Sequence, residues 1–140
     1  MQSLGYALVL GFALAGAQGN VAEASGCMRY EPDTVRITGR LTRQMFYGAP
    51  EFGEDPKHDE KETGFYLHLA APVCTAGRND NDRKTNVRLV QLVLDSTGYA
   101  SLRPFLGKSV TLRGTLSAAV SGHHHAPILL SVAKPAHVER

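Results

Sequence analysis

The chain has 140 residues, of which 43% are hydrophobic and 20% are charged, with two cysteines and no tryptophan. This length provides for one small hydrophobic core, so two full-sized domains are excluded. Fifteen basic residues against thirteen acidic ones leave a formal net charge of +2, and this charged fraction is too low for a disordered polyelectrolyte. We therefore expect one folded globular domain.

An uncharged apolar run occupies residues 4–17. It is shorter than the roughly 20 residues of a transmembrane helix, and its place near the N-terminus is typical of a signal peptide. Two small-residue cleavage sites follow, and we favour the one after Ala24 over the one after Ala17. We predict that residues 1–24 are a signal peptide and that residues 25–140 are a single domain, periplasmic or secreted, without a stable membrane anchor.

The two cysteines are Cys27 and Cys74. In an oxidising compartment such a pair is expected to form a disulfide. The bridge would close a loop of 48 residues, for which restriction of the unfolded chain gives about 4 kcal/mol of stabilisation. A reactive thiol or a thiolate metal site is the less favoured interpretation, because the sequence has no Cys-x-x-Cys spacing.

Apolar and polar residues alternate along most of the domain, which predicts β-strands. The five predicted strands are residues 34–46, Phe65 up to Pro72, 87–94, 110–118 and 128–132. The second is expected to end at Pro72, because proline lacks the N–H group that a strand ladder needs. The third is almost continuously apolar, so we expect both of its faces to be largely covered.

One short helix is predicted between the third and fourth strands. Asp95 suits a helix N-cap, Gly107 suits a helix stop, and Pro104 limits the helix to about two turns. Three strands, a short helix and two strands follow the order of the OB-fold. We predict an all-β domain with one short helix, a five-stranded OB-fold-like Greek-key barrel (β-β-β-α-β-β). An open antiparallel sheet with one helix is the alternative.

Two of the predicted strands resemble each other in sequence. Residues 35–42 align with residues 110–117, and each segment carries a glycine on its inward side, Gly39 and Gly114. A glycine in the middle of a strand often marks a bend or a bulge where a small barrel coils.

The connection between the first two strands is long and acidic. Residues 48–64, which we call the acidic insert, contain six acidic residues and two lysines, whereas the rest of the exported domain is basic. A solvated, mobile hairpin loop is the expected structure. Calcium binding is the less favoured alternative, because the acids do not follow the spacing of an EF-hand.

Three successive histidines, His123, His124 and His125, lie at the predicted turn between the last two strands. Imidazole is a common ligand of zinc and copper, and His123 and His125 would project to the same side of an extended segment. A metal site would need a further ligand, from His58, from His68 or from the acidic insert. We expect no such convergence and no cofactor, and the turn then closes the hairpin or contacts a partner. Metal binding and pH sensing are the alternatives.

A candidate ligand-binding face follows from the outward positions of the first three strands. Its members are Arg36, Arg40, Tyr66, His68 and Arg88. Arginine and tyrosine suit anionic or aromatic ligands, as in single-stranded nucleic-acid binding, but export argues against nucleic acid as the partner. We therefore expect an exported protein, a peptide or an envelope glycan, with a merely solvated strand face as the alternative.

Motifs of hydrolytic enzymes are missing from the sequence. It contains neither a Gly-x-Ser-x-Gly elbow nor a His-Glu-x-x-His motif, and both cysteines are assigned to the disulfide. We therefore predict a non-catalytic binding or interaction module rather than an enzyme. A metal-binding protein that uses the turn at residues 123–125 is the alternative function.

Five stretches carry a resemblance to a known family. They are residues 27–32, 65–69 together with 72–74, 90–93, 102–108 and 122–130. With Cys-x-x-Tyr-Glu-Pro in the first stretch and Gly-His-His-His-x-Pro in the last, the chain resembles a family of exported bacterial proteins catalogued as a domain of unknown function; Ala126 stands where its pattern has threonine. The resemblance implies a periplasmic location and supplies no activity. Some relatives occur beside lysozyme-inhibitor-like modules, which suggests inhibition of an envelope hydrolase, or protection against one.

Overall fold

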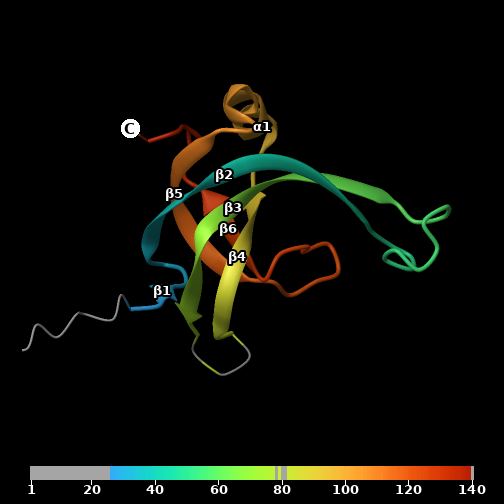
Figure 1. Cartoon of the computed structure of the whole chain (residues 1–140), viewed down its shortest axis with the longest axis horizontal. Coiled ribbons are helices and arrows are strands. Elements are labelled where there is room, and N and C mark those ends of the chain that lie inside the picture. The colour runs from blue at the N-terminus through green and yellow to red at the C-terminus, as the bar shows by residue number, and fades with distance from the viewer. Residues whose placement is uncertain (1–25, 78, 80–81, 140) are drawn as a thin grey trace, which may run out of the picture.

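The computed structural model describes residues 26–77, 79 and 82–139 (Figure 1). The predicted signal peptide, residues 1–24, lies outside the described residues. The elements in chain order are β1 (Met28–Arg29), β2 (Thr34–Tyr47), β3 (Lys61–Ala76), β4 (Lys84–Val93), α1 (Ser96–Leu102), the short 3-10 helix η1 (Arg103–Phe105), β5 (Ser109–Ala118) and β6 (Ile128–Val132). Within the described ranges, no helix has the length and hydrophobicity of a membrane span.

Five of the strands close into a barrel. The sheet runs β3-β2-β5-β6-β4, and β4 pairs again with β3, so the first and last strands meet. The β4–β6 pairing is parallel, and the other pairings within the barrel are antiparallel. The predicted five-stranded OB-fold-like barrel with one short helix is therefore confirmed. The alternative of an open sheet is wrong, because the β3–β4 pairing leaves no gap in the barrel.

The inward side chains of the strands fill the barrel. Ile37, Leu41, Leu67, Val90, Leu112, Leu116, Ile128 and Leu130 are at most 2% exposed. Leu102 of α1 is also fully buried in this cluster, so the helix packs against one end of the barrel (Figure 1). Along β2 and β5 alternation therefore matches the division between core and surface, whereas β3 and β6 each bury several consecutive residues.

The predicted helix boundaries agree with the structure. The Asp95 side chain accepts a hydrogen bond from the Gly98 backbone N–H at 2.8 Å and caps α1. Lys134 pairs with the same carboxylate at 2.8 Å, and this contact, followed by the Gly98 bond, lowers the pKa of Asp95. Gly107 follows η1 with φ at 82°, a left-handed conformation that side chains other than glycine rarely adopt.

The second strand is longer than predicted at both ends. It runs from Lys61 to Ala76 and passes through Pro72, where the sequence had indicated its end. The register between β3 and β4 shifts between His68 and Val73. Because a β-bulge leaves a residue unpaired, the missing N–H of Pro72 is tolerated in this stretch.

The short strand β1, which the sequence analysis did not predict, lies beside the end of β3. Met28 and Arg29 pair in parallel with Thr75 and Ala76. Directly before it, Cys27 forms the predicted disulfide with Cys74, with an S–S distance of 2.03 Å and a Cα–Cα distance of 4.7 Å. The bridge therefore ties the N-terminal segment to the barrel. Two residues are too few to show a periodic pattern, which explains why β1 was missed.

The outer face of β4 is less covered than its apolar sequence indicated. Val93 is 46% exposed and Arg88 is exposed, so the expectation that both faces are largely covered is wrong. In a closed barrel each strand has neighbours on both edges and still presents one face outward. An apolar run alone does not distinguish such a strand from the central strand of a covered sheet.

The two similar strands, β2 and β5, pair directly with each other, and each inward glycine lies opposite a valine. Gly39 pairs with Val110, and Gly114 pairs with Val35. A Cβ atom on Gly39 would come within 2.8 Å of the His68 carbonyl oxygen, and one on Gly114 within 2.1 Å of the corresponding oxygen of the next strand. The register between β2 and β5 has no shift. These glycines therefore permit close backbone approach rather than a bulge.

Candidate functional site

The β5–β6 loop, residues 119–127, is attached to the start of β3 by one carboxylate. Glu62 Oε1 contacts His123 Nδ1, and Glu62 Oε2 lies 2.6 Å from His125 Nε2. Each of the two carboxylate oxygens thus meets a different imidazole. The His123 side chain is 62% exposed and that of His125 is 11% exposed, so the contact at His125 is the more sheltered of the two.

Two further side chains brace the same loop. Oε1 of the Gln91 side chain, on β4, accepts a hydrogen bond from the His125 backbone N–H at 2.7 Å, and Nε2 of the same side chain donates to the His123 backbone carbonyl oxygen at 3.3 Å. Phe46 on β2 stacks on the His125 ring, with centroids 4.7 Å apart and an interplanar angle of 4°. The loop is therefore fixed to three strands, β2, β3 and β4.

The two imidazoles affect the protonation of Glu62. The hydrogen bond with His125 is the largest influence and lowers the pKa of the Glu62 carboxyl; burial opposes it, and the His123 bond adds to the lowering. The charged carboxylate is thus the form that the loop contacts favour. At neutral pH the junction therefore consists of one anion held between two imidazoles.

The middle histidine of the turn lies in a different environment. The ring atom His124 Nδ1 accepts a hydrogen bond from the Val120 backbone N–H at 2.9 Å, and the backbone N–H of His124 donates to the Ser121 carbonyl oxygen at 3.1 Å. Gly122, the residue before the three histidines, does not have a positive φ. Lack of space favours glycine at this position, because a Cβ atom there would lie 2.6 Å from the Phe52 ring.

His124 lines a groove of about 790 Å³ between the N-terminal segment and the barrel. The segment contributes residues 29–33, and the β5–β6 region contributes Ala118, Val120 and Leu129 in addition to His124. Val93 of β4 also lines the groove. Residues 29–33 and His124, which lie about ninety positions apart in the sequence, therefore line one depression of the surface.

The groove combines exposed apolar side chains with a rigidly held tyrosine. Val93 is 46% exposed and Val120 is 85% exposed. The Tyr30 hydroxyl lies 2.6 Å from the Asp82 carbonyl oxygen, to which it donates, and 2.9 Å from the hydroxyl of the fully buried Thr75. Large apolar groups left in contact with water beside a fixed wall are typical of a surface that binds another molecule.

Residues 89–136 match the sequence model of a domain of unknown function, DUF4431. The match confirms the family resemblance for this part of the chain, which contains Gln91, α1, β5, the histidine turn and β6. Glu62 and the N-terminal segment lie outside the matched residues. Among curated proteins and among solved structures, nothing matches the chain.

The expectation that no residue of the acidic insert converges with the histidine turn is wrong for Glu62. Glu62 belongs to the insert and reaches both His123 and His125, whereas His58 pairs with Asp55 of the insert at 2.5 Å. Across residues 26–77, 79 and 82–139, no group of three or more histidine, cysteine or acidic side chains is arranged to hold a metal ion. The convergence therefore takes the form of a hydrogen-bonded junction.

The rest of the acidic insert is more ordered than a solvated loop. The Asp59 side chain is 8% exposed, and its two oxygens accept from the backbone N–H groups of Glu51 at 2.8 Å and Gly53 at 2.6 Å. A single carboxylate therefore organises the tip of the hairpin. Figure 1 shows this β2–β3 hairpin extending well beyond the barrel.

The predicted ligand-binding face is assembled only in part. Arg40 lies opposite His68 across β2 and β3, and the Arg88 guanidinium reaches the Ala70 carbonyl on β3 at 3.3 Å, so Arg40, His68 and Arg88 stay exposed on neighbouring strands. Arg36 instead lies beside β5, opposite Arg113, and pairs with Glu139 at 2.5 Å.

Tyr66 is not part of an exposed face. It has the outward register that alternation predicts, opposite Gln91 and Thr42, but it is only 1% exposed. Phe46 packs on it with ring centroids 5.3 Å apart, and burial raises the pKa of its hydroxyl to about 12. The extended β2–β3 hairpin and the loop attached to it cover this outward position, which alternation alone does not reveal.

Sequence reasoning missed the residues that hold the histidine turn. Glu62, Gln91 and Phe46 come from three different strands, and each is unremarkable in its local sequence. One indication was present in the sequence. Glu62, Tyr66 and His68 occupy alternate positions of β3, which alternation places together on its outward side. Which loop covers that face depends on the closure of the barrel and not on any one strand.

Proposed function

We propose that this chain is a non-catalytic binding module that acts in an oxidising compartment, periplasmic or secreted, and binds an extended segment of an exported protein. The groove between residues 29–33 and the β5–β6 loop is the site proposed for this contact. Inhibition of an envelope hydrolase, or protection against one, is the role that the family resemblance adds to this proposal.

The observation that carries the proposal is the composition of the groove. It holds exposed Val93 and Val120 beside Tyr30 and His124, and its volume of about 790 Å³ suits several side chains of a partner. Apolar surface that is rimmed by polar groups is a common feature of protein-binding sites. A partner chain lying in the groove would remove both valines from water.

The proposed compartment rests on the disulfide and on the apolar run at residues 4–17. Disulfides persist in exported proteins and are rare in the reducing cytosol. The bridge also secures the segment that forms one wall of the groove, because Cys27 immediately precedes it. An oxidising compartment would therefore keep the binding site intact.

A non-catalytic role is favoured by the arrangement of the titratable groups at the histidine turn. Glu62 engages His123 and His125, and His124 accepts a backbone hydrogen bond, so these side chains act on each other and on the chain. The same contacts disfavour the alternative of a metal-binding protein, because a metal ion would have to displace them.

The experiment is capture of partners from a cell-envelope extract by the disulfide-intact domain, followed by calorimetry with each purified partner. Val93→Asp and Val120→Asp place charge in the groove. Met45→Asp is the matched control, because Met45 is 45% exposed and is not among the groove residues. We expect a protein that both groove variants lose, with affinity reduced at least about tenfold, while the control retains it.

Two results would replace the proposal. Capture of an acidic envelope glycan that Arg88→Gln loses and Val120→Asp retains would assign function to the basic residues on β2–β4. Stoichiometric binding of zinc or copper that is lost in the His123→Ala/His125→Ala variant would assign a metal-binding function instead. A partner held equally by all groove variants would exclude the groove.

A further inference from the structure

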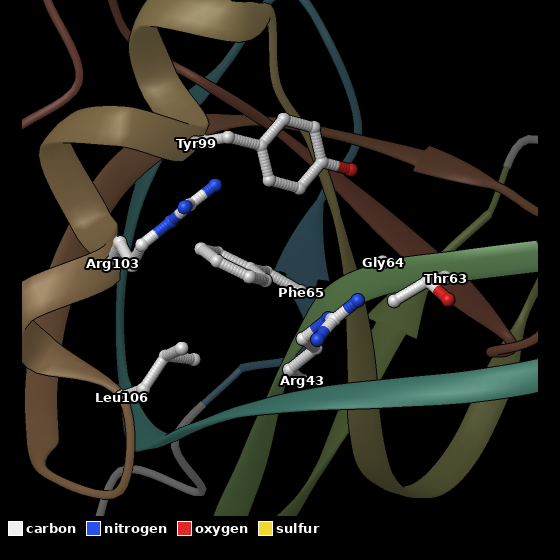
Figure 2. A pocket seen from close by; sticks show the side chains of 7 residues that line it. All are labelled: Arg43, Thr63, Gly64, Phe65, Tyr99, Arg103 and Leu106. Atoms are coloured by element: carbon white, nitrogen blue, oxygen red, sulfur yellow. The ribbon is translucent and has the colours of Figure 1, made fainter.

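A second cavity lies where α1 meets the β2–β3 ribbon, away from the groove. Its volume is about 410 Å³, within the range of small-molecule sites. The lining residues are Arg43 from β2, Thr63, Gly64 and Phe65 from β3, Tyr99 from α1, Arg103 from η1, and Leu106 (Figure 2). None of them also lines the groove proposed for the protein partner.

The charged side chains of this cavity are both arginines. Figure 2 shows Arg43 and Arg103 entering from different elements, on either side of the Phe65 ring. Neither guanidinium has an ion pair or a side-chain hydrogen bond with any of the residues that the structure describes. The contrast with Arg36, which pairs with Glu139 at 2.5 Å, shows that the chain elsewhere satisfies an arginine with an acid.

Two aromatic rings form a further part of the cavity wall. Phe65 and Tyr99 meet edge to face, with centroids 4.9 Å apart and an interplanar angle of 75°. Phe65 is 4% exposed and Tyr99 is half-buried, so both rings are held in place by the core. Leu106 extends the apolar surface on the side of the helix. A ligand that enters the cavity would thus find apolar contact as well as positive charge.

We propose that this cavity binds a small anionic ligand in which a carboxylate or phosphate group is attached to a ring. Guanidinium groups bind both oxyanions through paired N–H donors and stack on flat groups. The Phe65 and Tyr99 rings and Leu106 accommodate the ring of the ligand, while Arg43 and Arg103 neutralise its charge. Bare inorganic phosphate would use only the arginines and is expected to bind more weakly.

The test is calorimetric titration of the disulfide-intact protein with phenyl phosphate, benzoate, inorganic phosphate and the neutral analogue benzyl alcohol. We expect one site per chain for phenyl phosphate or benzoate, and the stronger of the two identifies the preferred oxyanion. Benzyl alcohol and inorganic phosphate should each bind at least about tenfold more weakly, because each lacks one of the two kinds of contact.

Variants assign the binding to the two arginines. Arg43→Gln and Arg103→Gln should each weaken the preferred probe about tenfold, and Arg113→Gln, an exposed arginine on β5 outside the cavity, should leave it unchanged. All three positions are exposed, so thermal unfolding of the variants should match that of the wild type.

Several results would overturn the proposal. They are equal affinity for benzyl alcohol and phenyl phosphate, unchanged affinity in both cavity variants, and no saturable binding of either ring-bearing anion up to about 10 mM, since ligands of this size in a true site bind more tightly. The capture experiment with Val120→Asp is independent of these outcomes. A failure of the anion site therefore leaves the protein-binding proposal standing, and the reverse also holds.

Discussion

Glu62 Oε2 and His125 Nε2 lie 2.6 Å apart although 63 positions separate the two residues in the chain. The contact connects the start of β3, next to the loop at the tip of the long hairpin, with the loop that precedes β6. In an OB-fold the corresponding two loops flank the usual ligand-binding face. Here the two loops are joined to each other. The β5–β6 loop therefore covers part of that face, and the opposite side of the same loop forms one wall of the groove.

Removal of the carboxylate should release the β5–β6 loop. We expect Glu62→Ala to lower the free energy of unfolding by about 1–3 kcal/mol, the usual contribution of hydrogen bonds that involve a charged group. Amide exchange at His125 should become faster, because its N–H to Gln91 depends on the position of the loop. Urea unfolding and amide exchange measure the two effects.

The matched control for this substitution is Glu60→Ala. Glu60 is exposed, and no side-chain contact involves it among the described residues. Its replacement should change stability by less than about 0.5 kcal/mol. Equal effects of the two variants would show that the junction at Glu62 contributes nothing specific.

The stabilising effect of Glu62 should depend on pH. The loop contacts lower the pKa of this carboxyl from its ordinary value of 4.5, so its contribution is fully present above that value and is lost as the pH falls through the lowered pKa. The stability difference between wild type and Glu62→Ala should therefore be constant from about pH 5 to 5.5 and should shrink below about pH 4.5. The groups that face this carboxyl are the imidazole rings of His123 and His125.

Urea unfolding of both proteins across this pH range provides the measurement. A difference that stays unchanged down to pH 3 would contradict the assignment of the effect to ionised Glu62. A difference that grows on acidification would reverse its sign and would show that the protonated carboxyl is the form that the folded protein prefers.

A methyl group on Gly114 should be strongly destabilising. Its Cβ would lie 2.1 Å from the Ser131 carbonyl oxygen and 3.1 Å from Leu130 Cδ1, so the β5 and β6 backbones would have to separate. We expect Gly114→Ala to cost about 2–3 kcal/mol, at the upper end for overpacking, with a lower midpoint in urea unfolding. Gly26→Ala is the control, because a Cβ there meets nothing within 4 Å.

Loss of the disulfide should destabilise the fold and release residues 29–33, the segment that forms one wall of the groove. The Cys27→Ser/Cys74→Ser variant opens a loop of 48 residues, for which chain entropy predicts a loss of about 4 kcal/mol. Urea unfolding measures it, and reduction of the wild type should reproduce the same shift. Unchanged stability together with unchanged partner capture would show that the bridge is dispensable for both roles assigned to it.

Local periodicity was sufficient to predict the barrel strands and the helix. Alternation located β2, β5 and β6 with ends close to those observed, and the Asp95 cap with Gly107 located α1. These signals work because a strand or a capped helix places its own neighbours in the chain on defined sides. The ends of β3 were not predicted, because a bulge within a closed barrel accommodates a proline that would interrupt a flat ladder.

The candidate site was predictable at the level of single residues but not as an arrangement. The histidine turn stood out in the sequence, and the disulfide followed from the cysteine count. The partner of the turn did not, because Glu62 was one of six acidic residues in the insert and no pattern separated it from the others. Tyr66 was expected to be exposed, and its burial depends on Phe46 and on the covering loop.

The sequence by itself determined which residues point inward along each strand, where the helix begins, and that Cys27 and Cys74 would pair. The first two properties depend on neighbours in the chain, and the third follows because two cysteines allow only one pairing. Only the tertiary structure decided that Glu62 joins the two loops, that residues 29–33 and His124 share a groove, and that Arg43 and Arg103 line one cavity. The reason is physical: closure of the barrel brings together side chains from distant strands, and no local pattern encodes which of them meet.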